Sequence, residues 1–433
     1  MALLVLKFGG TSVADIDKIR NAARHVKREI DAGHACAVVV SAMAGQTNQL
    51  IAWVEEAARA NGGDAAGGDS QNGETRAYDA CEYDAVVSSG EQVTAGLLAL
   101  VLQSLGVRAR SWQGWQIPLN TDPVHAKARI AGIEGHTLKG QVLDGEVAVV
   151  AGFQGIAPDG RIATLGRGGS DTSAVALAAA LDADRCDIYT DVDGVYTTDP
   201  RIVPQAQRMD RISYEEMLEM ASQGAKVLQT RSVELAMQRS VPVLVRSSFD
   251  SADLDAKADI AELGTLVCEE DEIVEQKVVS GIAYAPDEAK VTLIKVADKP
   301  GVAAGVFGPL AEANINVDMI VQNVSEDGRY TDLTFTVQSA DLERALDVLR
   351  SKKDEIGYAD LDGSTNVAKV SAIGVGMRSH AGVAAQMFHA LSEKGINIQA
   401  ISTSEIKISI LIDAAYAELA VRTLHTLFGL DSR

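Results

Sequence analysis

The stretch TLGRGGSDTSAVALAAAL, residues 164–181, indicates how the rest of the chain is organised. Three glycines, Gly166, Gly168 and Gly169, precede an alanine-rich run that favours a helix. Upstream, EVAVVA at residues 146–151 is typical of a buried strand and leads into a second glycine turn, GFQG. A strand, a glycine loop and a helix start together form an anion-binding site, because glycines allow close approach of the backbone and the helix N-terminus offers free N–H groups.

The polar side chains of this stretch suit an anionic ligand. Arg167 can make two parallel hydrogen bonds to a carboxylate or phosphate, and Ser170 and Asp171 fall at the start of the predicted helix. The alternative is that Ser170 or Asp171 only caps the helix, and this stretch by itself does not decide between the two.

Length and composition limit the class of protein. The 433 residues are enough for two or three domains, and the formal net charge of −21 argues against nucleic acids and anionic membranes as partners. No apolar run is expected to reach membrane-spanning length, and the start MALLVLKFGG is typical of a first strand and not of a signal peptide. The four cysteines have no metal-ligand spacing, so we expect a protein of the reducing cytoplasm.

Two more strand–loop–helix patterns occur near the N-terminus. KFGGTS at residues 7–12 follows a short apolar strand, and SAMAGQTN at residues 41–48 follows another. The alternation of strands and helices predicts an α/β sandwich with a mostly parallel sheet up to about residue 250. Because ligands bind at the carboxyl edge of such sheets, these loops would bring Lys7, Arg167 and Lys226 to one cleft.

Cations, N–H groups and acidic residues in one cleft favour phosphoryl transfer. The sequence has neither a G-x-x-x-x-G-K-[ST] loop nor an H-R-D loop, which argues against the kinase classes that use them. A carboxylate acceptor would need no general base, because it is already ionised near neutral pH.

Several acidic residues have two interpretations. Glu91, at the start of a predicted helix, either interacts with the helix dipole or faces a substrate ammonium group. Asp191 and Asp193 either hold Mg²⁺ together with phosphate oxygens or shape an Asx turn. Residues 61–75, rich in Gly, Asp, Asn and Ser, are expected to form an inert surface insertion.

An internal repeat occupies the C-terminal part of the chain. GVAA at residues 301–304 recurs at residues 382–385, and similar apolar residues follow each copy at matching spacings. Each copy is predicted to form a βαββαβ-like unit, which favours two small regulatory or binding domains. In the loops before their helices, backbone N–H groups can hold the carboxylate of a small ligand.

Taken together, the motifs resemble the aspartate kinase family. They are KFGGTS, Ser41-Ala42 with Thr47, Gly90-Glu91, GFQG, TLGRGGSD, YTDVDGVY at 189–196, Asp199-Pro200-Arg201 and GAKV at 224–227. The resemblance covers nearly the whole chain, because the repeats look like the ACT pair of that family. It implies an amino-acid-kinase-like αβα sandwich at residues 1–250, a linker at 251–265, and ferredoxin-like ACT domains at 266–363 and 364–433.

The resemblance also implies an activity, namely Mg-ATP-dependent phosphorylation of the L-aspartate side-chain carboxylate to 4-phospho-L-aspartate, in lysine, threonine and methionine biosynthesis. Lys7 and Asp171 would be catalytic, and no dedicated metal ligands are implied. The substrate-binding residues would be Ser41, Thr47, Glu91, Arg167 and Ser170. The nucleotide-binding residues would be Lys7, Gly9, Gly10, Thr190, Asp191, Tyr196, Arg201, Lys226 and Val227.

Feedback regulation is the second implication of the resemblance. The ACT domains would bind lysine, threonine or both through Asp298, Gly301, Ala303, Asp318, Gln322, Asn397, Ile398 and Ser404. Turn chemistry is an alternative explanation for Asn397 and Ser404. A homo-oligomer is expected, or a heterotetramer with a shorter ACT-only subunit. Two other functions stay open, a catalytically silent ACT amino-acid sensor and a kinase of the same fold for another carboxylate.

Overall fold

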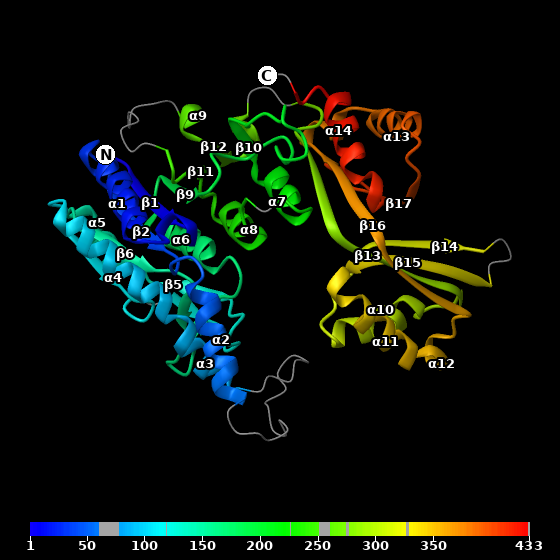
Figure 1. The fold of residues 1–433 in the computed structure, drawn as a ribbon, viewed down its shortest axis with the longest axis horizontal. Coiled ribbons are helices and arrows are strands. Elements are labelled where there is room, and N and C mark those ends of the chain that lie inside the picture. The colour runs from blue at the N-terminus through cyan, green and yellow to red at the C-terminus, as the bar shows by residue number, and fades with distance from the viewer. Residues whose placement is uncertain are drawn as a thin grey trace.

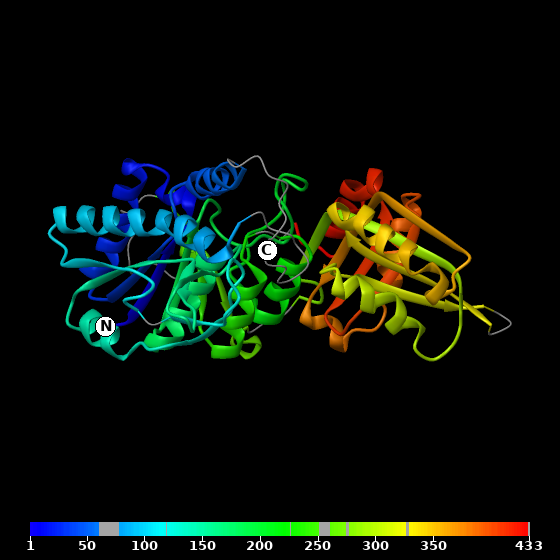
Figure 2. The ribbon, with the colours of Figure 1, turned by 90° about the horizontal axis from the view of Figure 1, so that it is seen from below.

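The computed structural model describes residues 1–59, 78–117, 119–225, 227–250, 260–273, 277–325 and 329–431. The predicted surface insertion, Lys226 and most of the predicted linker lie outside these ranges. The molecule is elongated, with an N-terminal α/β region at one end and a C-terminal region built on a second sheet at the other (Figures 1 and 2).

The N-terminal region is built on an eight-stranded sheet with the order β10-β12-β11-β9-β1-β2-β6-β3. Its strands are β1 (Leu3–Phe8), β2 (Ala35–Val40), β3 (Ala109–Trp112), β6 (Val147–Ala151), β9 (Arg185–Thr190), β10 (Arg211–Ser213), β11 (Val243–Ser247) and β12 (Thr265–Cys268). All neighbours are parallel except β11 and β12. Every residue of β1, β2 and β6 is buried, as expected for parallel strands covered on both faces. The predicted mostly parallel sheet is confirmed.

Helices cover both faces of this sheet (Figure 1). They are α1 (Ile16–Asp31), α2 (Gln46–Arg59), α3 (Ala80–Val87), α4 (Ser89–Ser104), α5 (His136–Leu143), α6 (Gly169–Leu181), α7 (Tyr214–Ser222), α8 (Thr230–Arg239) and α9 (Ile260–Leu263), with a 3-10 turn η1 (Gly10–Val13). Alternate residues of β1 point to opposite faces. Leu4 and Leu6 pack in one core with α1 and α4, while Leu3 and Val5 pack in another with α5 to α8.

A four-stranded sheet, not predicted from the sequence, lies beside the main one, with the order β5-β4-β7-β8. Its strands are β4 (Leu119–Thr121), β5 (Ile130–Ile133), β7 (Gln154–Ile156) and β8 (Ile162–Thr164).

One helical segment is apolar enough to resemble a membrane span. By length and composition Ala80–Ser104, which comprises α3 and α4, could cross a membrane, contrary to the expectation from the sequence. Half of its most apolar window is buried inside the protein. Since α4 packs against α1, β3 and β6, this segment is a core helix.

The C-terminal region is a six-stranded antiparallel sheet with the order β14-β15-β13-β16-β18-β17. Its strands are β13 (Gly281–Ala297), β14 (Asp318–Val324), β15 (Tyr330–Gln338), β16 (Asp360–Ile373), β17 (Ile398–Thr403) and β18 (Lys407–Asp413). Its helices are α10 (Val302–Glu312), α11 (Leu342–Ser351), α12 (Lys353–Ile356), α13 (Val383–Glu393) and α14 (Ala417–Leu427). The remaining 3-10 turns are η2 (Glu270–Glu272), η3 (Ser339–Asp341), η4 (Val375–Ser379) and η5 (Ala414–Tyr416).

The two repeat units share their central strands. Residues 281–285 of β13 pair with residues 369–373 of β16, in the half of the sheet that holds α13 and α14. Further along β13, residues 288–297 pair with β15 of the first unit. The start of β13 therefore belongs structurally with the second unit.

The second repeat unit is also fixed to the N-terminal region. The carboxylate of Glu216 on α7 accepts hydrogen bonds from the Ser280 hydroxyl (2.6 Å) and the Val375 N–H (3.0 Å). Lys407 on β18 forms an ion pair of 2.9 Å with Glu219 on α7. These contacts connect one ACT unit directly to a helix that packs on the main sheet.

Candidate active site

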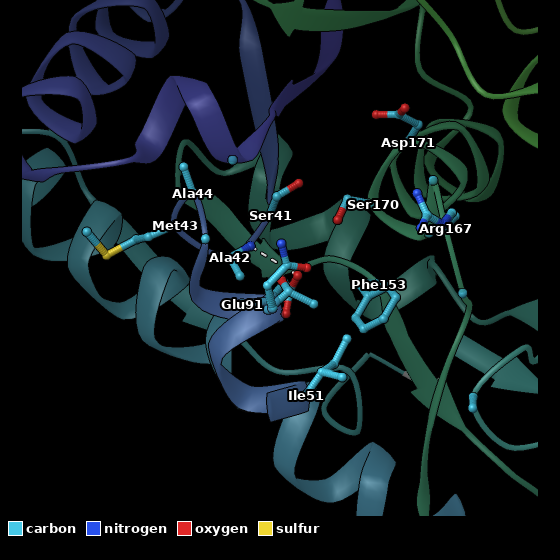
Figure 3. Close-up of a pocket in the computed structure, with 18 of the residues that line it drawn as sticks. Ser41, Ala42, Met43, Ala44, Ile51, Glu91, Phe153, Arg167, Ser170 and Asp171 are labelled. Carbon is cyan, nitrogen blue, oxygen red and sulfur yellow. Dashed lines mark hydrogen bonds between the residues drawn. The ribbon is translucent and has the colours of Figure 1, made fainter. Parts of the chain in front are cut away.

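A cleft of about 620 Å³ lies where β1, β2 and the start of α6 meet (Figure 3). All seven residues predicted to be catalytic or substrate-binding line it, namely Lys7, Ser41, Thr47, Glu91, Arg167, Ser170 and Asp171. The structure thus brings together four segments that are far apart in the sequence.

Lys7 and Asp171 form the central ion pair of the cleft. Lys7 lies near the end of β1, opposite Val39 of β2 and Ile188 of β9, and is only 8% exposed. Its Nζ is 2.5 Å from Oδ1 of Asp171, in the first turn of α6. A buried lysine next to one carboxylate is a cation held in a fixed position.

The start of α6 decides between the two interpretations of Ser170 and Asp171. The residue that precedes the helix is Gly168, in the left-handed conformation (φ 70°), and no side chain caps the helix. A Cβ on Gly168 would collide with the side chain of Gln229, so this position requires glycine. Because Ser170 and Asp171 do not cap the helix, their side chains are available to the cleft, as Figure 3 shows.

Glu91 is a buried carboxylate at the opposite wall. It is 3% exposed, and Oε1 accepts a hydrogen bond of 3.0 Å from the Ala42 N–H (dashed line in Figure 3). Within the described residues, Oε2 has no hydrogen-bond partner. Burial raises the pKa of this carboxyl to about 7, despite the opposing effect of the Ala42 hydrogen bond. A buried carboxylate beside a cleft, with a hydrogen-bond partner for only one of its two oxygens, is suited to bind a cationic group of a ligand.

A polar network behind the cleft was missed by the sequence analysis. Asp84 on α3 is fully buried and accepts hydrogen bonds from the Ala126 N–H (3.0 Å) and the Thr164 hydroxyl (2.5 Å). His125 Nδ1 lies 2.8 Å from the same carboxylate. Ala126 has a left-handed backbone (φ 64°), and both it and Lys127 line the cleft. Asp84 thus holds a strained turn that presents Lys127 to the cleft.

Part of the set predicted to bind nucleotide, namely Gly9, Gly10, Thr190 and Asp191, lies around the adjoining ends of β1 and β9. The Gly9 N–H donates to the Tyr189 carbonyl (3.3 Å), so Thr190 lies directly beside the glycine loop, whose Gly10 lines the cleft. Asp191 follows Thr190 and accepts its hydroxyl at 3.1 Å.

Two other members of this set have partners already. The Tyr196 hydroxyl donates to the carboxylate of Asp193 at 3.0 Å. Arg201, whose side chain is 90% exposed, pairs with Asp199 at 2.7 Å. Val227 is half-buried.

The predicted effector residues are spread over the second sheet. Gly301 precedes α10 in the left-handed conformation (φ 94°), between exposed Asp298 and Ala303. Asp318 is at the start of β14, pairs with Lys369 of β16 at 2.6 Å, and has its pKa lowered by this partner. Gln322 is exposed on β14.

Ser404 lines a second cavity, of about 440 Å³, at the start of α13. Its N–H donates to the Lys407 carbonyl (2.8 Å) and its hydroxyl accepts from the Ile406 N–H (3.4 Å), so turn chemistry applies to this residue. Asn397 and Ile398, at the start of β17, are not among the residues that line this cavity.

Comparison with known proteins agrees with this architecture. Residues 2–247 match the amino acid kinase family, and residues 290–354 and 370–428 each match an ACT domain. The chain is 52% identical to an aspartate kinase of Pseudomonas fluorescens over 433 residues, which is 100% of this chain and 98% of the relative. It is 51% identical to an aspartokinase of Pseudomonas aeruginosa, with the same coverage of both chains.

Two solved structures of one enzyme resemble the fold. The complex of E. coli aspartokinase III with aspartate and ADP, in the R-state, has a TM-score of 0.77 and 29% identity, and covers 98% of this chain and 99% of that one. The complex of the same enzyme with lysine and aspartate, in the T-state, has a TM-score of 0.72 at the same identity and coverage.

Proposed function

The chain belongs to the aspartate kinase family, and we propose that its cleft holds L-aspartate between Arg167 and Glu91, with the side-chain carboxylate toward Lys7. The chain is an aspartate kinase, a phosphotransferase that is regulated through its ACT domains. The reaction converts ATP and L-aspartate to ADP and 4-phospho-L-aspartate.

Charge complementarity supports this orientation of the substrate. Glu91 lines the cleft, and its Oε2, which has no hydrogen-bond partner among the described residues, would accept the ammonium group of aspartate. Arg167 would bind a substrate carboxylate with two parallel hydrogen bonds. Ser41, Thr47 and Ser170 also line the cleft and would donate hydroxyl hydrogen bonds to the substrate.

Phosphoryl transfer in this cleft would depend on positioning and charge. Lys7 would neutralise charge on the moving phosphoryl group, and Asp171 would hold Lys7 through their 2.5 Å ion pair. The first N–H groups of α6 point to the same region, with the positive end of the helix dipole. The acceptor carboxylate attacks directly, so no covalent enzyme intermediate is needed.

The nucleotide would bind next to the substrate, at Gly9, Gly10, Thr190, Asp191 and the other residues predicted for it. E. coli aspartokinase III binds ADP together with aspartate, which supports this arrangement. We propose Mg²⁺ as the accompanying ion. Phosphate oxygens would supply most of its ligands, with Asp171 of the cleft as the nearby carboxylate.

Lysine, threonine or both are the proposed effectors. The lysine complex of E. coli aspartokinase III supports lysine for a relative with the same domain order. The eight predicted effector residues remain the proposed contacts. The ion pair between Lys407 and Glu219 offers a physical connection from the ACT sheet to the catalytic region.

We further propose a cytoplasmic protein that forms a homo-oligomer or a heterotetramer with an ACT-only subunit. All four cysteines are free thiols, which agrees with a reducing compartment.

The observation that carries the proposal is the convergence of the seven predicted residues on one cleft. Its test is ATP consumption by the purified protein with L-aspartate or L-glutamate as acceptor. We expect turnover with aspartate and almost none with glutamate, whose side chain is one methylene longer. Equal turnover would instead favour a kinase for another carboxylate.

A further inference from the structure

Three potential metal ligands lie close together, and none of them is among the residues that line the cleft. They are Cys81 on α3, His125 in the loop between β4 and β5, and Asp159 in the loop between β7 and β8. One ligand atom from each, a sulfur, a ring nitrogen and a carboxylate oxygen, lies within 4.8 Å of the other two. None of the three belongs to the proposed catalytic set.

The histidine is oriented from behind by a buried carboxylate. His125 Nδ1 is 2.8 Å from Oδ2 of fully buried Asp84, which already accepts hydrogen bonds from Ala126 and Thr164. Because Asp84 acts as an acceptor in these contacts, Nδ1 carries a proton, and in the neutral imidazole Nε2 has the free lone pair. Nε2 faces Asp159, with 3.9 Å to Oδ2. A carboxylate on the far nitrogen is the usual support of a metal-binding histidine.

The other two ligands are accessible. Cys36, Cys186 and Cys268 are buried, whereas Cys81 is half-buried. Oδ1 of Asp159 accepts the Arg161 N–H at 2.9 Å, and the Arg161 side chain pairs with Glu82 instead. Oδ2 of Asp159 is therefore directed to the histidine without a competing guanidinium.

We propose that Cys81, His125 and Asp159 bind one zinc ion. A sulfur, nitrogen and oxygen donor set matches Zn²⁺, whereas Mg²⁺ and Ca²⁺ prefer oxygen ligands alone. Zinc–ligand bonds of about 2.0–2.3 Å require the three donors to move together by roughly 1 Å, which side-chain rotation can supply, and water would take the fourth position.

Zinc binding would release the proton of the Cys81 thiol. The thiolate is the form of cysteine that binds zinc, so metal binding displaces the thiol proton. The bound ion would join α3 to the turn that carries Ala126 and Lys127. It would therefore stiffen the cleft wall without entering the cleft.

The test uses the full-length protein after removal of metal. Zn²⁺ is titrated against a chromophoric chelator, and Co²⁺ is titrated separately to detect a thiolate-to-cobalt absorption band. We expect one equivalent of each ion and a cobalt band in the parent protein. Cys81→Ser should abolish the band, and both Cys81→Ser and Asp159→Asn should weaken Zn²⁺ binding at least tenfold. Both residues are accessible, so neither change should prevent folding.

An exposed histidine elsewhere supplies the control. His389 lies 3.3 Å from Glu393 on the surface of α13 and could bind zinc adventitiously. His389→Gln should leave affinity and stoichiometry unchanged. The proposal is overturned if the parent protein does not bind Zn²⁺ at micromolar concentration, if Cys81→Ser binds it equally well, or if His389→Gln removes the binding.

Discussion

Glu91→Gln should make the enzyme more stable and less active, and the gain in stability should depend on pH. The parent carboxyl is buried with one unpartnered oxygen, and its pKa rises from 4.5 to about 7. Glutamine keeps a carbonyl oxygen for the Ala42 N–H but carries no charge. The substitution therefore removes the cost of burying an ionised group.

The size and sign of the effect follow from the shift in pKa. The folded state holds the Glu91 proton up to about pH 7, whereas the unfolded state loses it near pH 4.5. Stability is therefore full below pH 4.5 and falls as the pH rises from 4.5 to 7, by about 3 kcal/mol in total. Glu91→Gln should be more stable than the parent by up to about 3 kcal/mol at pH 8, and by less than about 1 kcal/mol at pH 5.

Scanning calorimetry of both proteins at pH 5 and pH 8, without substrate, measures this difference. Glu56→Gln, a change at an exposed glutamate on α2, is the matched control and should shift neither melting temperature. In turnover assays, Glu91→Gln should lower kcat/KM for aspartate about a hundredfold, because the ammonium group loses its buried partner. An equal gain in stability at both pH values, or unchanged kcat/KM, would refute the reasoning.

Three other substitutions test separate parts of the account. Lys7→Ala should reduce kcat at least a hundredfold with the circular dichroism spectrum unchanged, because the fixed cation of the cleft is lost; near-normal turnover would contradict its role. Asp84→Asn should raise KM for aspartate and lower kcat several-fold, since one of the two oxygens that accept from Ala126, Thr164 and His125 becomes an amide donor, and kinetics equal to the parent would show that this carboxylate is not needed. Lys407→Met should leave kcat unchanged when no effector is present. It should lower the effector concentration for half-inhibition about fivefold, because loss of the ion pair with Glu219 would remove about 1 kcal/mol that favours the active state. Inhibition curves that coincide with those of the parent would exclude that contribution.

The local motifs of the cleft could be predicted from the sequence because each one is short. A glycine loop between a strand and a helix specifies its own backbone, so residues such as Lys7 and Arg167 could be assigned before the fold was known. The packing of three such loops at one sheet edge then follows from the parallel topology. The same local information left Glu91 undecided, because its hydrogen bond with the Ala42 N–H depends on the fold, while the residue also stays in the first turn of α4.

Features that depend on distant contacts could not be predicted in this way. Asp84 binds groups 41 and 80 residues further along the chain, and no spacing pattern marks such a network. The GAKV motif at 224–227 is followed by α8, which begins only at Thr230. Gly224 has φ 110° and lies against the backbone of Tyr284, so a contact with β13 determines the conformation there.

The repeat likewise indicated two units but not their shared strands. Equivalent sequences suggest two separate sheets, whereas β13 and β16 run through both halves of one sheet. The strands extend beyond the repeated motif because each pairs with a strand of the other copy. Comparing the sequences of the two copies does not reveal this pairing.

The most direct test of the central claim is to trap the acyl phosphate product as its hydroxamate, with Mg-ATP and L-aspartate, in the presence and absence of lysine and threonine. The account predicts hydroxamate that requires aspartate and is suppressed by one or both of these amino acids. Well-folded protein that forms no hydroxamate would contradict the proposed chemistry of the cleft, and hydroxamate that neither amino acid suppresses would contradict the proposed effectors.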